Sequence, residues 1–407
     1  MAGSTRHSRI SSREELLRCL AERESLAGVV FRGVDLRDAP DVEGRDLNGA
    51  VFLGCTFRDR EQEHRLVERG AAIFPALGGL PYEPYRRGLY SVEELLEGLD
   101  AGGYVGTRDF RIYTWFDRAR RRPAGVGLRE SLAQRLHDHA IDEALGAFLR
   151  ESSGAGVVGV MGGHGMSRTD PSYAKVVRLC RGLARAGRCV ISGGGPGVME
   201  AANLGAWLAR HDDPGVVDRA LALLAPAPRF DGGELEGTSA YLAAIERYFA
   251  CGRRVLAELG GPGTPPANLA MPTWFYGHEP TNLFATHVAK YFSNSLREDG
   301  LLAIATGGVV YAPGSAGTLQ EVFQDLAQNH YASHGSRSPM VFLGRRHWGE
   351  AFTLLQSFAR DKGRDRGYQD LLALVDEPEE ALEFLARTPQ RLVPAARPLW
   401  ELVPPPA

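Results

Sequence analysis

The sequence predicts an α/β protein with a doubly wound parallel sheet and an additional N-terminal α+β or helical segment. From about Gly154 onward, short apolar runs alternate with helical stretches. Strands separated by helices in this way form parallel sheets that are covered on both faces. Several of the apolar runs also end in glycine-rich turns. Because doubly wound sheets bind ligands beyond the carboxyl ends of their strands, these turns are the first place to look for a site.

The composition of the 407-residue chain is that of an ordinary soluble globular protein, with 44% hydrophobic and 24% charged residues. Its net charge of -3 favours neither a nucleic-acid nor a membrane partner. The N-terminus lacks the apolar segment of a signal peptide, and no apolar run is long enough to span a bilayer. The five cysteines are scattered without zinc-site spacing. We therefore expect a cytoplasmic protein without a metal site.

Residues 1–150 are predicted to form an auxiliary domain. Capping boxes indicate helices that begin after Ser12 and Ser91, and residues 132–150 form an amphipathic helical pattern. Residues 31–57 have a faint pentapeptide-like rhythm. A short β-rich piece is the favoured interpretation, because a solenoid needs at least three stacked repeats. The basic cluster at 115–125 is interpreted as a solvated turn, with a phosphate or nucleic-acid contact as the alternative.

Residues 151–388 are predicted to form the domain with the parallel sheet, and 389–407 form a proline-rich tail. The periodicity predicts strands within 156–163, 188–195, 269–276, 307–314 and 339–344. It predicts helices over 171–187, 198–210, 281–298 and 318–329.

Three of the strand ends carry glycine-rich turns, at 161–167, 192–200 and 312–321. Glycine lets a ligand approach main-chain N–H groups closely, and the helix that follows presents unpaired amides and a positive dipole end to an anion. A single such turn can serve steric needs alone, but three at one sheet edge favour a phosphate-bearing ligand. Neither a P-loop nor a GxGxxG dinucleotide motif with its acidic partner is present.

Two glutamates follow these turns, and each has two interpretations. Glu321 lies four residues past Gly317, and Glu200 follows the second glycine loop in the same way. A carboxylate in the first turn of a helix often only compensates the helix dipole. Alternatively, it acts on a ligand that the preceding loop holds.

The stretches "SGGGPGVMEAANLGA" and "PGSAGTLQE" resemble the signature pair GGGxxGxM and PGGxGTxxE of the Lonely Guy (LOG) family. The resemblance covers residues 154–344 and implies a Rossmann-like fold. It also implies a phosphoribohydrolase, which cleaves the N-glycosidic bond of a nucleoside 5′-monophosphate to give free base and ribose 5-phosphate. The length of the chain is more similar to the larger bacterial nucleotide 5′-monophosphate nucleosidases of this family. A homodimer or a dimer of dimers is likewise implied.

Members of this family are often labelled lysine decarboxylases, but the sequence does not favour that activity. A PLP-dependent decarboxylase needs a Schiff-base lysine. The chain has only Lys175, Lys290 and Lys362, and none of them lies in a glycine-lined strand end. No cofactor is therefore expected.

The resemblance also implies which residues act. It places the catalytic glutamate at Glu321 and pairs it with Arg297, 16 residues before Pro313. The chain departs from the family pattern at Ser315, where the motif has glycine, and it lacks the Met and Lys that usually flank the arginine. The expected substrate-binding residues are Gly163, His164, Gly193, Gly194, Gly195, Pro196, Gly197, Met199, Glu200, Gly314, Ser315, Ala316, Gly317 and Thr318.

Four further features of the sequence each have more than one interpretation. Trp274, Phe275 and Tyr276 could stack on a base or belong to a core strand. His278 and His287 lack partners at metal-ligand spacing, so a metal role is disfavoured. The glycine loops would also suit a non-catalytic nucleotide carrier or sensor, and the N-terminal domain could be an interaction module. The Glu321–Arg297 pair favours catalysis.

Overall fold

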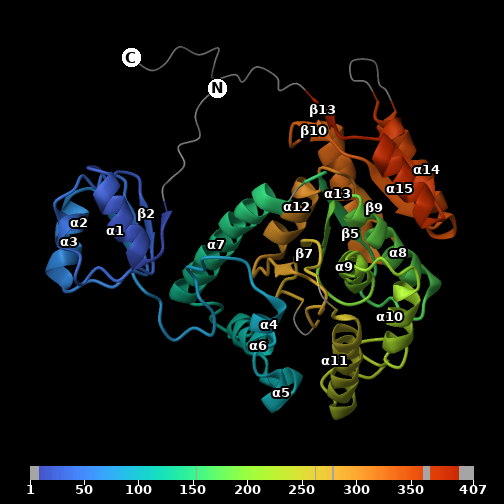
Figure 1. Cartoon of the computed structure of the whole chain (residues 1–407), viewed down its shortest axis with the longest axis horizontal. Helices are drawn as coiled ribbons and strands as arrows, with labels where there is room; N and C mark the ends of the chain where they lie inside the picture. The colour runs from blue at the N-terminus through green and yellow to red at the C-terminus, as the bar shows by residue number, and fades with distance from the viewer. Residues whose placement is uncertain (1–8, 153, 262, 277–278, 361–366, 394–407) are drawn as a thin grey trace. The chain divides into compact units, whose positions relative to one another are not determined.

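The computed structural model describes residues 9–152, 154–261, 263–276, 279–360 and 367–393. The chain divides into a smaller unit, residues 1–88 and 119–144, and a larger unit, residues 89–118 and 145–407 (Figure 1). The sequence-based boundary at residue 150 differs from this division, because residues 89–118 group with the larger unit. Most of the predicted tail, from 394 onward, lies outside the described residues.

The smaller unit is a stack of parallel strands with a 21-residue repeat. Its strands pair in the order β1-β2-β3-β4, and Arg9, Val30, Val51 and Ala72 are aligned at successive intervals of 21 residues. A short helix follows each of the first three strands. The elements are β1 (Arg9–Ile10), α1 (Arg13–Glu22), β2 (Val30–Arg32), α2 (Pro40–Glu43), β3 (Val51–Leu53), α3 (Arg60–Glu68) and β4 (Ala72–Phe74). The segment is thus a short solenoid, which the sequence analysis had set aside.

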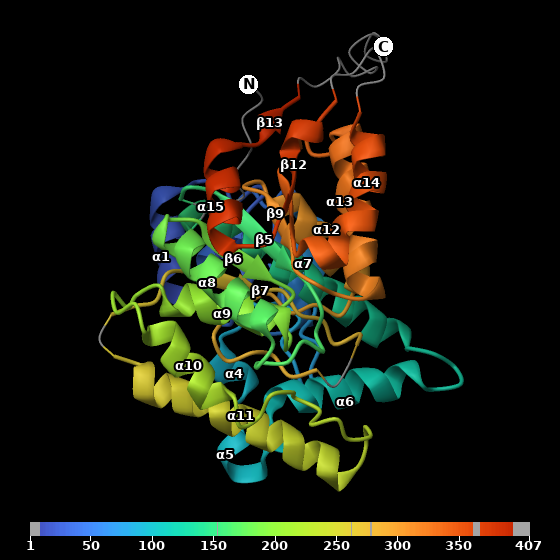
Figure 2. The same cartoon turned by 90° about the vertical axis from the view of Figure 1, so that its right-hand side faces the viewer.

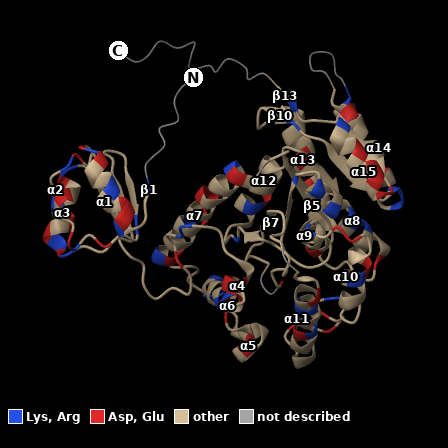
Figure 3. Ribbon diagram, in the orientation of Figure 1, with Lys and Arg blue, Asp and Glu red and all other residues tan. Residues whose placement is uncertain are grey.

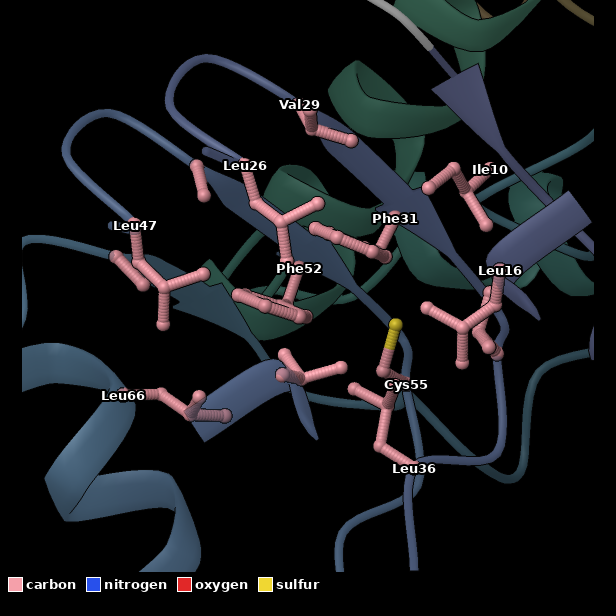
Figure 4. Close-up of a cluster of buried hydrophobic side chains, with 14 residues drawn as sticks. Ile10, Leu16, Leu26, Val29, Phe31, Leu36, Leu47, Phe52, Cys55 and Leu66 are labelled. Carbon is pink, nitrogen blue, oxygen red and sulfur yellow. The ribbon is translucent and has the colours of Figure 1, made fainter. Parts of the chain in front are cut away.

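The same 21-residue spacing builds the core of the smaller unit. Phe31 and Phe52 occupy equivalent places in consecutive repeats, and their rings stack with centroids 4.5 Å apart (Figure 4). Leu26 and Leu47 are also equivalent, and both are fully buried. Glycines with positive φ recur at the same interval, at Gly28, Gly49 and Gly70, where the chain turns before each strand. The pentapeptide-like rhythm of residues 31–57 is thus part of a longer period of 21 residues.

The larger unit is built on a seven-stranded, entirely parallel sheet with the order β12-β11-β9-β5-β6-β7-β8. The chain runs from β5 outward to β8, then returns to place β9 on the other side of β5. This reversal between β5 and β9 is the topological switch point, where doubly wound sheets form their binding crevice. The strands are β5 (Val157–Met161), β6 (Cys189–Ser192), β7 (Asn268–Ala270), β8 (His287–Val288), β9 (Val309–Tyr311), β11 (Met340–Leu343) and β12 (Leu372–Val375).

Helices cover both faces of this sheet, as the fold class predicts. Figure 2 shows α8, α9 and α15 on one face and α12, α13 and α14 on the other. Most strand residues are therefore buried on both sides. These helices are α8 (Pro171–Arg185), α9 (Val198–Leu208), α12 (Asn294–Ile304), α13 (Ala316–Tyr331), α14 (Arg345–Ala359) and α15 (Pro378–Arg387). α10 (Val216–Leu224) and α11 (Ser239–Leu259) pack against each other, and a separate strand pair joins β10 (Ser336–Arg337) to β13 (Arg391–Leu392).

Residues 89–118 contribute α4 (Val92–Leu95), α5 (Leu99–Gly102), η1 (Tyr104–Gly106) and most of α6 (Arg108–Arg120). A buried polar cluster fixes α6 to the sheet domain. Asp109 accepts hydrogen bonds from Lys290 Nζ at 2.8 Å, from Trp274 Nε1 at 2.8 Å and from the Thr281 hydroxyl at 3.1 Å. All four side chains are almost fully buried. The buried pair of Asp109 and Lys290 thus connects α6 to the sheet of the larger unit.

The predicted helix over 281–298 is wrong for most of its length. The chain is irregular up to the short strand β8, and α12 begins only at Asn294. Buried side-chain hydrogen bonds replace the helical ones. Asn282, for example, donates from its backbone N–H and from its side-chain amide to the carbonyl of Gly194. Asn and Thr side chains compete with helical backbone bonds in this way.

Charged residues of both signs are interspersed along the outer helices, including α1, α7 (Leu128–Ser152) and α15 (Figure 3). The basic cluster at 115–125 continues α6 into a turn, and its Arg122 lies 3.6 Å from the Glu130 carboxylate. Within the described residues, no helix is both long and apolar enough to cross a membrane.

Candidate active site

The three predicted glycine turns meet at the carboxyl edge of the sheet. The turn after β5 contacts the turn after β9, because the N–H of Gly163 donates to the carbonyl of Pro313 at 3.1 Å. The carbonyl of Gly163 in turn accepts from the N–H of Val198, at the start of α9, at 3.2 Å. Glycine is required where these backbones touch. A Cβ on Gly197 would lie 2.4 Å from the Gly163 carbonyl oxygen, well inside van der Waals contact.

A buried polar network holds the loop after β6. The Ser192 hydroxyl donates to Asn203 Oδ1 at 2.7 Å and accepts from the N–H of Gly194 at 3.1 Å. Asn282 donates to both Asn203 Oδ1 and the carbonyl of Gly194. The polar groups at the root of the loop are thereby satisfied internally, which fixes its shape. Gly193 and Gly195 remain facing the cavity.

The turn after β9 leads directly into α13. Ser315 occupies the N-cap position, yet its hydroxyl makes no capping hydrogen bond to the helix. The first-turn amides of α13 therefore have no side-chain cap from Ser315, and such amides are anion donors. Thr318 is buried, and a Cβ on Gly314 would lie 2.2 Å from its hydroxyl oxygen. The glycine at 314 is thus needed for the close approach of loop and helix.

These turns line a cavity of about 470 Å³, a size typical of small-molecule sites. The structure brings most of the predicted site residues together there. The predicted residues that line it are Gly163, His164, Gly193, Gly195, Met199, Arg297, Ser315, Ala316, Gly317, Thr318 and Glu321. The remaining lining residues are Gly162, Pro272, Thr273, Tyr276, Glu279, Glu298 and Gln320.

Glu321 and Arg297 face each other in this cavity. Arg297 Nη1 lies 3.5 Å from Glu321 Oε1, and their side chains are only 9% and 15% exposed. Burial raises the pKa of Glu321 to about 7, although Arg297 lowers it, and the charge of Glu298 raises it further. A carboxyl group that titrates near neutrality in a cleft is typical of a functional site. The dipole-compensation interpretation alone does not account for this arrangement.

Glu298 is a cavity residue that the sequence analysis missed. It lies next to Arg297, with Oε1 3.5 Å from Arg297 Nη2, and Oε2 accepts from Gln320 Nε2 at 3.1 Å. The other acceptor for Arg297 Nη2 is Asn294 Oδ1, at 2.8 Å. The sequence held one signal for this residue: the chain has glutamate at position 298, where the LOG pattern has lysine.

Glu200 and four of the predicted glycine-loop residues do not line the cavity. The Glu200 carboxylate is 1% exposed and accepts two hydrogen bonds from Arg168, at 2.6 and 2.8 Å. The hydroxyls of Tyr173 and Tyr248 also donate to it, at 2.8 and 2.7 Å. Its acceptors are therefore saturated inside the core. The loop residues outside the cavity lining are Gly194, Pro196, Gly197 and Gly314, which shape the turns.

The aromatic run at 274–276 is divided between core and cavity. Trp274 is fully buried and packs against Tyr90 and Phe292, so it is a core residue. Tyr276 is about half exposed and lines the cavity. His278 lies outside the described residues, and His287 contacts the ring of Phe148. Across the described ranges, no group of His, Cys, Asp or Glu is arranged to hold a metal ion.

Comparison with protein families gives two matches within the larger unit. Residues 155–213 match the family described as "SLOG cluster4 family", and residues 260–385 match the family described as "Possible lysine decarboxylase". These matches contain the glycine turns, Arg297 and Glu321. Both matched regions support the resemblance to the LOG family that the glycine motifs carry. This family suggests a nucleotide-related function of the phosphoribohydrolase type.

Solved structures that resemble the chain include two molybdenum cofactor proteins. The molybdenum cofactor binding protein from Rippkaea orientalis is 14% identical, over 57% of this chain and 96% of its own, with a TM-score of 0.33. The molybdenum cofactor carrier protein from Chlamydomonas reinhardtii is 16% identical, over 57% and 97%, with a TM-score of 0.33. Likenesses this distant carry no functional argument. No curated protein sequence matches the chain.

Proposed function

We propose that the protein hydrolyses the N-glycosidic bond of nucleoside 5′-monophosphates, releasing free base and ribose 5-phosphate. The observation that carries this proposal is the Glu321–Arg297 pair, held 3.5 Å apart in a cavity that three glycine turns line. The first turn of α13 supplies the phosphate site. Its free amides, together with the hydroxyls of Ser315 and Thr318, donate hydrogen bonds to the phosphate oxygens.

Glu321 is one turn further along α13 and acts on the sugar. As the base leaves, positive charge develops at the anomeric carbon, and a nearby carboxylate stabilises that charge. The same carboxylate accepts a proton from the water that attacks this carbon. The water oxygen bonds to the anomeric carbon, the bond to the base nitrogen breaks, and the base leaves with its electron pair and is then protonated.

Arg297 orients the substrate and Glu321 in this scheme. A guanidinium is a poor proton donor at neutral pH, so the leaving base does not take its proton from Arg297. Its Nε is buried and has no hydrogen-bond partner among the described residues.

A lysine-dependent decarboxylation is not supported by the same cavity. Lys290 is buried against Asp109, and Lys175 pairs with Glu377, so neither lines it. Lys362 lies outside the described residues.

The test is to incubate the wild type with a panel of purine and pyrimidine 5′-monophosphates and to quantify free base and ribose 5-phosphate. The Glu321→Ala variant should lose on the order of 10²- to 10⁴-fold in kcat, with an unchanged circular dichroism spectrum. Near-wild-type turnover in this variant would remove Glu321 from the mechanism. Tight nucleotide binding without any product would instead favour a carrier or sensor. We also propose the homodimer or dimer of dimers that the family resemblance implies.

A further inference from the structure

Glu279 is a third carboxylate in the cavity, and it is not part of the group formed by Glu321, Arg297 and Glu298. Its side chain is 26% exposed, and the imidazole of His164 lies beside it, with Nδ1 3.7 Å from Glu279 Oε1. Within the described parts of the chain, no donor makes a hydrogen bond to this carboxylate. The other two carboxylates of the cavity are engaged by Arg297 and Gln320. The Glu279 carboxylate is therefore available to accept hydrogen bonds from a ligand.

The loop after β6 lies next to both Arg297 and Glu279. A Cβ on Gly193 would lie 3.6 Å from Arg297 Nη1, and a Cβ on Gly195 would lie 3.2 Å from Glu279 Oε2. The side chain of Met199 would touch both positions. Arg297 and Glu279 thus lie at opposite ends of the same three-residue loop. A sugar held at Glu321 would direct its base along this loop, past Met199, toward Glu279.

A carboxylate at the base end of a cavity selects between bases by hydrogen bonding. Its two oxygens accept two parallel N–H donors, as in other bidentate carboxylate pairs. Guanine presents two such donors side by side, at N1 and at the amino group on C2. Adenine and cytosine place a ring acceptor beside their amino group, and uracil places a carbonyl on each side of its N–H. Each of these alternatives sets an acceptor against the carboxylate.

We infer that Glu279 makes this cavity a guanine site, so that guanosine 5′-monophosphate is the preferred substrate. The inference rests on the proposed function for the position of the sugar and the phosphate. The ring of Tyr276, half-exposed at the same cavity, is available to stack on the base.

The experiment compares the wild type with Glu279→Gln on the 5′-monophosphates of guanosine, adenosine, cytidine, uridine and xanthosine. The wild type should favour the guanine nucleotide over the other four in kcat/KM, by on the order of 10- to 100-fold. Glu279→Gln should lose this preference. It should also gain activity on the xanthine nucleotide, because the glutamine amide can donate to the carbonyl on C2. Glu298→Gln makes the same chemical change in the same cavity and should keep the wild-type order of bases.

Equilibrium binding of the same nucleotides to Glu321→Ala, with and without Glu279→Gln, separates this inference from the proposed function. Guanine-selective binding that Glu279→Gln abolishes would support the inference even if no nucleotide were hydrolysed. Hydrolysis of all five nucleotides at similar kcat/KM would overturn it and leave the hydrolase intact. An equal effect of Glu279→Gln on every nucleotide would also overturn it, because Glu279 would then face the phosphate or the sugar.

Discussion

Glu321 shows how a single residue can be adjusted for chemistry at neutral pH. Its pKa of about 7 is a balance between burial and Glu298, which raise it, and Arg297, which lowers it. At pH 7 the ionised and protonated forms are therefore both well populated. An enzyme that needs the carboxylate form should gain activity as the pH rises through this value.

The first prediction is that kcat rises with pH around a midpoint near 7, and that Glu298→Gln moves this midpoint to lower pH. Removing the charge of Glu298 makes ionisation of Glu321 easier. Steady-state kinetics between pH 5 and 9 measure this shift. Glu279→Gln is the matched control, since Glu279 is not among the groups that shift Glu321. An unchanged midpoint in Glu298→Gln would assign the titration to another group.

Asp325 lies one helical turn beyond Glu321 and is a buried carboxyl group outside the cavity lining. It accepts a hydrogen bond from the Tyr311 hydroxyl at 2.8 Å. Burial raises its pKa from the ordinary 3.8 to about 7, although the Tyr311 hydrogen bond lowers it. The native state therefore keeps a proton on Asp325 over a pH range in which the unfolded chain has lost it.

The second prediction concerns stability between pH 4 and 8. Because the unfolded state binds fewer protons than the native state in this window, Asp325 makes stability fall as the pH rises through it. Asp325→Asn removes this contribution. The difference in unfolding free energy between the variant and the wild type should therefore increase, in favour of the variant, by roughly 4 kcal/mol from pH 4 to pH 8. Urea unfolding at the two pH values measures the gain, with the exposed Glu350→Gln as control. A pH-independent difference would contradict the assignment.

At the scale of elements, two glycines at the turn from β9 into α13 differ in how much space they leave for a side chain. Gly314→Ala would force its Cβ to within 2.2 Å of the Thr318 hydroxyl oxygen and 3.0 Å of the Gly163 N–H nitrogen. Gly317 lies inside α13, and a Cβ at this position would have no neighbouring atom within 4 Å. The two substitutions add the same methyl group three residues apart.

The third prediction is that Gly314→Ala lowers the thermal midpoint and Gly317→Ala does not. Overpacking of this kind costs about 1–3 kcal/mol, whereas replacing glycine in a helix by alanine stabilises by up to about 1 kcal/mol. Differential scanning calorimetry of the two variants measures both effects. Equal midpoints would mean that the turn after β9 relaxes around the added methyl group.

The sequence predicts the elements of the sheet domain well because each glycine turn follows a short buried strand. Strands β5, β6, β9 and β11 lie within their predicted ranges. Helices α8 and α9 also lie within theirs, and α13 extends two residues beyond its predicted range at each end. The helix prediction for 281–298 is wrong because the Asn282 side chain forms hydrogen bonds to the distant loop after β6 and to Asn203. Local periodicity cannot reveal such long-range contacts. Glu279 was missed for a similar reason. It belongs to a loop, so only the fold brings it to the cavity.

At the scale of the whole molecule, the division into units has an experimental consequence. Residues 89–118 belong to the larger unit, although residues 1–88 and 119–144 form the smaller one. The Asp109 carboxylate supplies the only acidic partner that the described residues show for the buried ammonium of Lys290. A fragment that begins at residue 151 would leave that charge buried and unpaired.

The fourth prediction follows from this pairing. A fragment of residues 151–407 should fail to fold, whereas a fragment of residues 89–407 should retain the sheet domain. Breaking a buried ion pair by removing one partner costs about 3–5 kcal/mol, so Asp109→Ala in the full chain should destabilise the larger unit by that amount. Replacing the exposed Asp100 of α5 by alanine should leave its stability within about 0.5 kcal/mol of the wild type. Near-ultraviolet circular dichroism and urea unfolding measure these differences. A stably folded 151–407 fragment would show that the sheet domain ends where the sequence alone had placed its boundary.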